Sequence, residues 1–409
     1  MAIKFPPIVM LTTGFYPPDI GGLEVVVHNY ARILAENGHE VYVITPKKEG
    51  SVPKEIIDGI HIYRFPLDFG EAERALFQNL QVQEFKTKTT CDIMEILDEI
   101  GRPVIVHAHA EVIIAGGWLK EQDDRLKLVY SPHGSPGILK ELYQAKIFGL
   151  FYRKALANTD LIAYQLMDEI AILNEFMETY NFRELINFID PELFNPSNYE
   201  KLSSRQILKL PKNSTIIFSP TRIDEVKGLN ELIQALPRVL ERYPDSYLYI
   251  AGSLTEGYII NPILIKQRLL RNVRKYLPEF TDRVRFTGAI DYHDMPKWYS
   301  ASDLIILLTH DECLPMCVLE SMAMEKPIVI TNVGGIPSLL ENTPGRIIDI
   351  SSNNKASPIE AAKAIIEELD KLKDQIGSLQ TLREKILNSY SPKIGYLKLK
   401  AIYSELCGL

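Results

Sequence analysis

The chain has 409 residues, more than a single hydrophobic core usually supports, so two domains are expected. Hydrophobic residues make up 46% and charged residues 24%, an ordinary globular balance that excludes wholesale disorder and fibrous repeats. With 45 basic and 53 acidic residues the net charge is −8 and no long basic block occurs, which makes nucleic acid a poor candidate partner.

The cysteine content and the apolar runs indicate where the protein works. Four cysteines are too few for a disulfide scaffold and lack zinc-finger spacing, so a reducing compartment is expected. The N-terminal apolar run is broken by Pro6 and Pro7, unlike a signal peptide. The densest apolar stretches, such as Leu304–Leu308, are far shorter than the ~20 residues of a spanning helix. We therefore expect a cytoplasmic protein, and leave open a peripheral contact with the inner face of the membrane.

Short β-branched runs alternate with helix-length segments through the first half of the chain. The predicted strands are Ile8–Thr12, Val41–Thr45, Ile60–Arg64, Val104–His107, Lys127–Ser131 and Leu161–Tyr164. Between the first two, Leu23–Asn37 has the apolar spacing of an amphipathic helix, and Gly38 stands where a helix commonly ends. Buried-looking strands that alternate with helices indicate βαβ units and a parallel sheet.

The alternation stops between about Asp190 and Asn213, where three prolines and a cluster of Asn and Ser predict a linker, and then resumes. The later strands are predicted at Thr215–Ser219, Tyr247–Ala251, Val284–Thr287, Leu304–Leu308 and Pro327–Thr331, and the later helices at roughly Leu229–Arg242, Pro262–Tyr276, Cys317–Glu325 and Ile359–Leu372. The fold class is therefore α/β, with two doubly wound, Rossmann-like domains at residues 1–195 and 196–389. Because such sheets bind ligands beyond the carboxyl ends of their strands, we expect the two domains to face a shared cleft.

Two glutamates with seven residues between them form the strongest chemical signal, in the string DECLPMCVLESMA at residues 311–323. Glu312 is predicted on the loop after strand Leu304–Leu308, and Glu320 in the first turns of the next helix. Ionised carboxylates only accept hydrogen bonds, which suits the adjacent hydroxyls of a sugar or a ribose. Taken singly, each is more simply explained as a surface or helix N-terminal carboxylate.

A basic pair follows strand Thr215–Ser219 in the string PTRIDEVKG. Arg222 and Lys227 flank a tight loop that ends in glycine and opens the next helix. A helix N-terminus with nearby Arg and Lys suits the charges of a pyrophosphate. The simpler alternative is a solvated basic pair balanced by neighbouring acidic residues.

The N-terminal half offers weaker signals. Gly21 and Gly22 could bring backbone N–H groups close to a ligand, although a simple turn is the default and the GxGxxG fingerprint is absent. His107 and His109 end one strand and His133 follows another. His-x-His suggests metal, but no third ligand is in evident reach and the chain has no Asp-x-Asp. We expect His107 to be structural, His133 to contact a ligand, and no metal to be bound.

The strings GFYPPDIGGLE, VHAHA, SPHG, TRIDEVKG, AGS, FTG, DECLPMCVLESMA and TNVGGIP occur in the order seen in the retaining glycosyltransferases of family 4, and the chain resembles that family over nearly its whole length. The Glu-x7-Glu and Arg-x4-Lys strings together are its specific part. The resemblance implies the GT-B fold, with an N-terminal acceptor-binding domain and a C-terminal domain that binds a nucleotide-sugar donor. It also implies that the last helix, roughly Pro392–Cys407, crosses back onto the N-terminal domain at about residues 390–409.

The resemblance also implies roles for single residues. Arg222 and Lys227 are implied to contact the diphosphate, Glu320 the ribose hydroxyls, and Glu312 with the following backbone the donor sugar. Gly21 and Gly22 are implied near the phosphate, and His133 near the donor sugar. The implied catalytic residues are Arg222, Lys227, Glu312 and His133. The implied donor-binding residues are Gly21, Gly22, Arg222, Lys227, Gly252, Glu312, Leu314, Pro315, Met316 and Glu320.

The chain departs from the family pattern at three places. Leu314 and Pro315 stand where many relatives have Phe-Gly, as in a common Leu-Pro variant, and Pro315 has no N–H to donate. The string at residues 187–190, Asn-Phe-Ile-Asp, replaces an expected Asn-Gly-Val-Asp, and Ser338 replaces a glutamate. These departures affect the identity of donor and acceptor more than the reaction class.

The predicted reaction is a retaining, metal-independent and cofactor-free sugar transfer from a nucleotide-diphosphate-sugar to an acceptor hydroxyl of a sugar, a lipid-linked molecule or a small molecule. A sugar-nucleotide epimerase or phosphorylase of the same fold and a non-catalytic nucleotide-sugar-binding protein are the alternatives.

The segment Leu139–Leu156 interleaves basic and aromatic residues. A helix packed on the N-terminal sheet is the favoured interpretation, and a membrane-surface helix is the other. The nucleotide, the sugar, the acceptor and the oligomeric state do not follow from the sequence.

Overall fold

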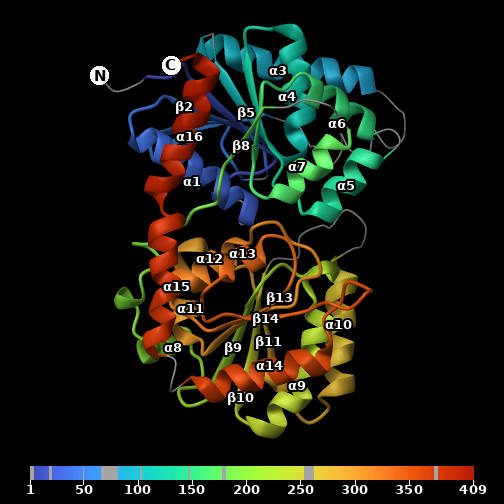
Figure 1. Cartoon of the computed structure of the whole chain (residues 1–409), viewed down its shortest axis with the longest axis vertical. Helices are drawn as coiled ribbons and strands as arrows, with labels where there is room; N and C mark the ends of the chain where they lie inside the picture. Colours follow the sequence, from blue (N-terminus) through green and yellow to red (C-terminus); the bar gives the residue numbers. More distant parts are fainter. Residues whose placement is uncertain are drawn as a thin grey trace. The chain divides into compact units, whose positions relative to one another are not determined.

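The computed structural model describes residues 4–17, 21–48, 50–65, 82–101, 104–145, 148–176, 181–252, 262–372 and 376–409. The chain divides into two compact units, Met1–Phe188 with Pro392–Leu409, and Ile189–Ser391. The final helix, α16 (Pro392–Cys407, red in Figure 1), belongs to the first unit and packs against α1 (Gly22–Glu36). It therefore returns to the N-terminal unit as expected.

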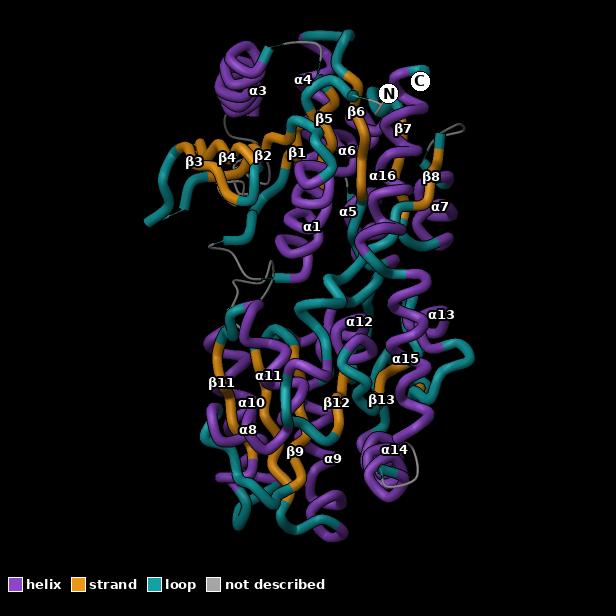
Figure 2. Tube along the Cα trace, turned by 90° about the vertical axis from the view of Figure 1, so that its left-hand side faces the viewer, coloured by secondary structure: helices purple, strands orange, loops and turns teal. Residues whose placement is uncertain are grey.

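The first unit is built on an eight-stranded sheet with the order β3-β4-β2-β1-β5-β6-β7-β8, which can be followed in Figure 2. Its strands are β1 (Ile8–Leu11), β2 (Val41–Pro46), β3 (Lys54–Ile57), β4 (Ile60–Phe65), β5 (Ile105–His109), β6 (Lys127–Ser131), β7 (Leu161–Tyr164) and β8 (Phe182–Glu184). Neighbouring strands pair in parallel, except β3 with β4. The edge strands β3 and β8 were not predicted, because they are short and none of their residues is buried.

Helices cover both faces of this sheet. Besides α1 and α16 they are α3 (Val82–Ile100), α4 (Ile113–Gln122), α5 (Pro136–Gln144), α6 (Phe148–Ala157) and α7 (Met167–Asn174). Apolar residues of α3 to α7 join those of one sheet face, including Val106 and Ala108 of β5, in a single core. His107 and His109 alternate with them and point to the other face, where α1 and α16 lie.

The helices α5 and α6 settle how the segment between Leu139 and Leu156 is used. Tyr143, Tyr152 and Leu156 are buried in the core of the first unit together with Leu139. The segment therefore packs on the N-terminal sheet, the favoured of its two interpretations. Across the described ranges, no helix combines the length and the apolar character needed to cross a membrane.

The second unit is built on a six-stranded, wholly parallel sheet with the order β11-β10-β9-β12-β13-β14. Its strands are β9 (Thr215–Pro220), β10 (Ser246–Ala251), β11 (Val284–Gly288), β12 (Leu304–Leu307), β13 (Ile328–Thr331) and β14 (Arg346–Ile348). Counted from β9, this is the 3-2-1-4-5-6 order of doubly wound nucleotide-binding sheets. The three-residue edge strand β14 was not predicted.

The helices of the second unit again lie on both faces (Figure 1). They are α8 (Lys201–Ile207), α9 (Leu229–Arg242), α10 (Pro262–Tyr276), α11 (Met295–Ala301), α12 (Met316–Ala323), α13 (Ile336–Leu340), α14 (Pro358–Lys371) and α15 (Ile376–Ser389). The apolar faces of α9, α10 and α14 form one core with the sheet. On the other face Phe218 of β9 stacks on Trp298 of α11, with ring centroids 5.5 Å apart.

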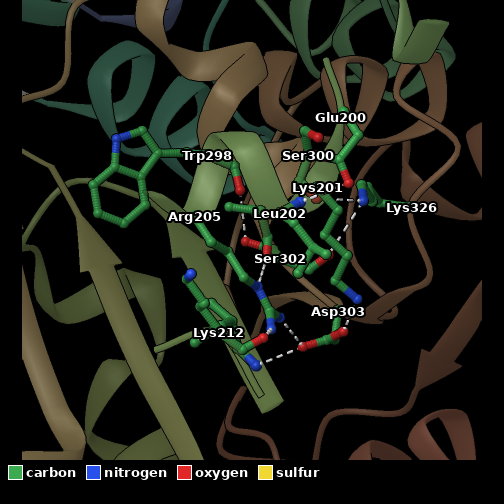
Figure 3. Close-up of polar contacts among 12 residues, drawn as sticks. Glu200, Lys201, Leu202, Arg205, Lys212, Trp298, Ser300, Ser302, Asp303 and Lys326 are labelled. Carbon is green, nitrogen blue, oxygen red and sulfur yellow. Dashed lines mark hydrogen bonds and ion pairs between the residues drawn. The ribbon is translucent and has the colours of Figure 1, made fainter. Parts of the chain in front are cut away.

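The predicted linker between Asp190 and Asn213 is wrong, because this segment contains α8 and packs inside the second unit. The buried guanidinium of Arg205 donates to the carbonyl of Ala301 at 2.9 Å and to Oδ2 of Asp303 at 2.7 Å (Figure 3). The units consequently divide after Phe188 and after Ser391, rather than after residues 195 and 389. Proline and polar content suggested a linker, but the segment contains a buried cation that its own unit satisfies.

Candidate active site

The order of the second sheet reverses between β9 and β12, since the chain leaves β9 toward β10 while β12 lies on the other side of β9. Ligands of doubly wound sheets bind beyond the carboxyl ends of the strands at such a point. The loop after β9 carries Arg222 and Lys227, and the loop after β12 carries Glu312. The two predicted motifs therefore begin at the same place in the sheet.

One ion pair joins these motifs across 85 positions of sequence: Nζ of Lys227 lies 2.5 Å from Oε2 of Glu312. The side chains are 11% and 21% exposed, so both charges are largely shielded from water while part of each stays accessible. The hydroxyl of Thr309 lies 3.5 Å from the same carboxylate oxygen. The structure thus brings together a cation suited to phosphate and a carboxylate suited to sugar hydroxyls.

Two glycines allow the loops around this pair to touch backbone to backbone. Gly228 has φ +63°, and a Cβ there would lie 1.9 Å from the carbonyl oxygen of Leu308. Gly334 has φ +51°, and its Cβ would lie 1.8 Å from the carbonyl oxygen of Glu312. Only glycine fits either position. Gly334 was not among the predicted site residues, although the string TNVGGIP contains it.

Gly252 and Arg222 lie near the β9–α9 loop but do not contact the Lys227–Glu312 ion pair in the part of the chain that the structure describes. A Cβ on Gly252 would lie 2.1 Å from the carbonyl oxygen of Thr221, so this glycine fixes the start of the β9–α9 loop. Arg222 is exposed, and no hydrogen bond or ion pair joins its side chain to another described residue. The structure gives Gly252 a packing role and leaves the Arg222 guanidinium in solvent.

Glu320 lies in the second turn of α12, and its side chain is almost wholly enclosed, with 5% exposed. The hydroxyl of Tyr299 on α11 donates to Oε2 of Glu320 at 2.6 Å. Burial raises the pKa of Glu320 to about 7, while the bond from Tyr299 acts in the opposite direction. Tyr299 was missed from the sequence because it lies 21 residues earlier on another helix and carries no motif of its own.

Three of the seven residues between the two glutamates, Leu314 to Met316, lie at the N-terminus of α12. Pro315 is the N-cap, and Leu314 and Met316 are 7% and 6% exposed. Because their side chains are buried in the protein, these residues can contact a ligand only through their backbone. The nearby Cys317 is a free thiol whose pKa is raised by burial and by the charges of Glu320 and Glu312.

In the first unit, the predicted glycines stand at the N-terminus of α1. Gly21 is the N-cap in extended conformation, and Gly22 is the first helical residue. A Cβ on Gly22 would meet no atom within 4 Å in the part of the chain that the structure describes. The protein's own packing therefore does not account for a glycine at this position.

The predicted ligand residue His133 follows β6, and both of its ring nitrogens are engaged. Nε2 of Gln165 donates to Nδ1 of His133 at 3.0 Å, so the neutral ring carries its proton on Nε2 and donates it to Nδ1 of His109 at 2.9 Å. His109 then presents its own proton to Sδ of Met10 at 3.3 Å. Burial lowers the pKa of His133 to about 3 and that of His109 well below the ordinary value.

The backbone near these histidines is strained. His133 has φ +54° and Ala110, directly after β5, has φ +55°. Residues other than glycine rarely adopt this region, and such strain clusters at ligand sites. His107 is different: Tyr403 and Ser131 bond its two nitrogens at 2.8 Å each and it is fully buried, which fits the structural role expected for it. Among the described residues, no group of three or more His, Cys, Asp or Glu is arranged to hold a metal ion.

Comparison with known proteins identifies two family matches. The family described as Glycosyltransferase Family 4 matches residues 20–169, and the one described as Glycosyl transferases group 1 matches residues 200–378. A D-inositol 3-phosphate glycosyltransferase of Streptosporangium roseum is 25% identical over 339 residues, which cover 78% of this chain and 74% of that protein. The matches reach both units of the chain.

Solved structures share the fold. The sucrose-phosphate synthase of Thermosynechococcus elongatus has a TM-score of 0.79 at 21% identity, covering 98% of this chain and 99% of that one. Anabaena HepE in complex with UDP-glucose has a TM-score of 0.73 at 17% identity, covering 97% and 99%. The architecture of two Rossmann-like units is thus that of GT-B glycosyltransferases.

Proposed function

The chain belongs to glycosyltransferase family 4, and we propose that it transfers a sugar, with retention of anomeric configuration and without a metal ion, from a nucleoside-diphosphate-sugar to an acceptor hydroxyl. The Lys227–Glu312 ion pair at the switch point of the second sheet is the observation that carries this proposal. It sets a phosphate-binding cation and a sugar-binding carboxylate in direct contact. A nucleoside-diphosphate-sugar needs both groups side by side.

Lys227 acts on the leaving group. As the bond between the anomeric carbon and the phosphate oxygen breaks, negative charge grows on the diphosphate, and the ammonium stabilises it together with the N-terminus of α9. The acceptor oxygen bonds to the anomeric carbon on the face that the diphosphate leaves. The acceptor's proton passes to the departing phosphate oxygen. Arg222, exposed on the same loop, adds a second cation once a diphosphate is present.

The carboxylates hold the parts of the donor on either side of the diphosphate. Glu312 accepts hydrogen bonds from hydroxyls of the donor sugar, and its bond to Lys227 keeps both groups oriented in the absence of donor. Glu320 accepts from a ribose hydroxyl. The α12 N-terminus at residues 314–316 meets the donor sugar through its backbone. In the first unit, Gly22 and the strained His133 are the residues proposed to contact a ligand.

A thermal-shift screen with ADP, GDP, UDP and their glucose and mannose derivatives tests the donor class. The matching ligand at a hundredfold its Kd should add about 2.7 kcal/mol of stability. Turnover in EDTA tests metal independence: activity that disappears with the chelator and returns with Mg²⁺ or Mn²⁺ would contradict this part of the proposal. Product formed without an acceptor, or with inorganic phosphate alone, would instead identify an epimerase or a phosphorylase.

A further inference from the structure

A buried hydrogen bond holds Glu320 from the neighbouring helix. Tyr299 is fully buried on α11, and its hydroxyl donates to Oε2 of Glu320 at 2.6 Å. Among the described residues, this is the one hydrogen bond that the Glu320 carboxylate receives. The aromatic ring of Tyr299 packs edge-on against Phe218 and Phe194, with centroids 5.7 and 6.1 Å away. The ring of Tyr299 therefore packs in the core, while its hydroxyl donates a hydrogen bond to the Glu320 carboxylate.

Two further contacts fix the helices on which this pair stands. Lys326, just after α12, donates through Nζ to the carbonyl of Ser300 at 3.0 Å and to that of Ser302 at 3.2 Å, both within three residues after Tyr299 (Figure 3). The hydroxyl of Ser302 donates back to the carbonyl of Trp298 at 2.7 Å. The end of α11 and the turn after α12 are thus tied together, which leaves the Tyr299–Glu320 bond little freedom to open.

We infer that Tyr299 is a positioning residue for donor binding, whose hydroxyl holds Oε2 of Glu320 so that Oε1 is presented to the ribose of the nucleotide. The inference rests on the proposed contact between Glu320 and the ribose. A carboxylate with one oxygen already bonded cannot rotate to offer that oxygen, so its rotamer is set before the donor arrives. Tyr299 itself touches no ligand.

The bond from Tyr299 also favours the ionised form of Glu320, against the larger effect of burial on its pKa. The polar groups on the elements around it are Tyr299, the Cys317 thiol on the same helix, the Lys227–Glu312 pair, and Arg383 of α15, which donates to the carbonyl of Ala323 at 2.8 Å. Burial raises the pKa of Glu320 to about 7 and the bond from Tyr299 lowers it. Because the ionised form accepts from the ribose more strongly, nucleotide binding should weaken as the pH falls through about 7.

The experiment is a calorimetric titration of UDP, GDP and ADP into wild type and three variants at a series of pH values from ~5.5 to ~9. This range brackets the raised pKa of Glu320, about 7. Tyr299→Phe removes only the hydroxyl and keeps the ring. Loss of one hydrogen bond to the charged form should move the midpoint of the pH dependence about one to two units upward. Tyr249→Phe, which removes the hydroxyl of another buried tyrosine, on β10, is the matched control and should leave the midpoint unchanged.

Glu320→Gln distinguishes failure of the ribose contact from failure of the role given to Tyr299. If this variant binds nucleotide like wild type at every pH, Glu320 does not contact the ribose and is no part of the proposed donor site. If it weakens binding and removes the pH dependence, while Tyr299→Phe has the wild-type midpoint, the contact stands and the inference about Tyr299 is overturned. Should Tyr299→Phe unfold, the wild-type profile still decides, because an absent midpoint between pH 6 and about 8 would contradict a positioned, titrating Glu320.

Discussion

In the proposed mechanism Lys227 stabilises the negative charge that grows on the diphosphate as the donor is cleaved, so its loss should act on turnover more than on binding. Lys227→Ala should lower kcat by ~10²–10³-fold, the range found when one donor to a developing oxyanion is removed. Steady-state kinetics measures this. Lys86→Ala is the matched control, since it breaks another partly shielded lysine–carboxylate pair, with Glu121 at 2.6 Å, in the first unit. Equal kcat in both variants would remove Lys227 from the mechanism.

At the residue scale the sequence predicted the elements that carry the candidate site residues better than the contacts that these residues make. The spacing of Glu312 and Glu320 placed them on a loop and a helix, as found, because local patterns determine both. Tyr299 could not be predicted, since its contact depends on how two helices pack on the sheet. His133 was predicted from its place after a strand, but the pattern gave no sign that Gln165 and His109 take both ring nitrogens.

At the scale of elements, α8 shows which contacts hold a segment whose composition predicted a linker. Asp303 accepts from the guanidinium of Arg205 and from the backbone N–H of Ile216, each at 2.7 Å. Asp303→Asn leaves the buried Arg205 without its counter-charge, and should cost about 3–5 kcal/mol of unfolding free energy. Urea unfolding measures the loss.

The control for this prediction is Asp370→Asn, which breaks the exposed pair with Arg242 and should change stability by about 1 kcal/mol or less. A loss of that small size in Asp303→Asn would mean that α8 is not anchored by this carboxylate.

The difference between buried and exposed segments also explains which elements could be predicted. Long buried runs such as β9 and α9 were placed within a residue, whereas β3, β8, β14 and α8 are short or polar and depend on their neighbours.

At the scale of the whole molecule, the low pKa values of His107 and His133 predict how stability responds to acid. Burial lowers the pKa of His107 and of His133 to about 3, compared with an ordinary value of about 6.5. Between these values the unfolded chain binds the protons and the folded chain does not. Their contribution is therefore complete above pH ~6.5 and falls as the pH drops, by about 1.4 kcal/mol per pH unit for each histidine.

Urea unfolding of wild type and His133→Gln between pH 7 and about 5 checks this. His133→Gln removes one group that takes up a proton when the chain unfolds. The free energy of unfolding of the variant should therefore fall less steeply as the pH drops. His293→Gln, which replaces an exposed histidine, should keep the wild-type slope. Identical slopes in all three proteins would show that His133 is not held neutral in the folded chain.

In the proposed donor complex a nucleotide-sugar is bound at the carboxyl ends of β9 and β12, with Glu312 on the sugar and Glu320 on the ribose. Calorimetric titration of the bare nucleoside diphosphate and of the diphosphate-sugar into wild type, Glu312→Gln and Glu320→Gln tests it most directly. Glu320→Gln should weaken both ligands by about ten- to hundredfold, the loss of one charge-assisted hydrogen bond. Glu312→Gln should spare the bare diphosphate and weaken the diphosphate-sugar. The reverse pattern would exchange the two roles, and wild-type affinity for both ligands in both variants would show that this is not the donor site.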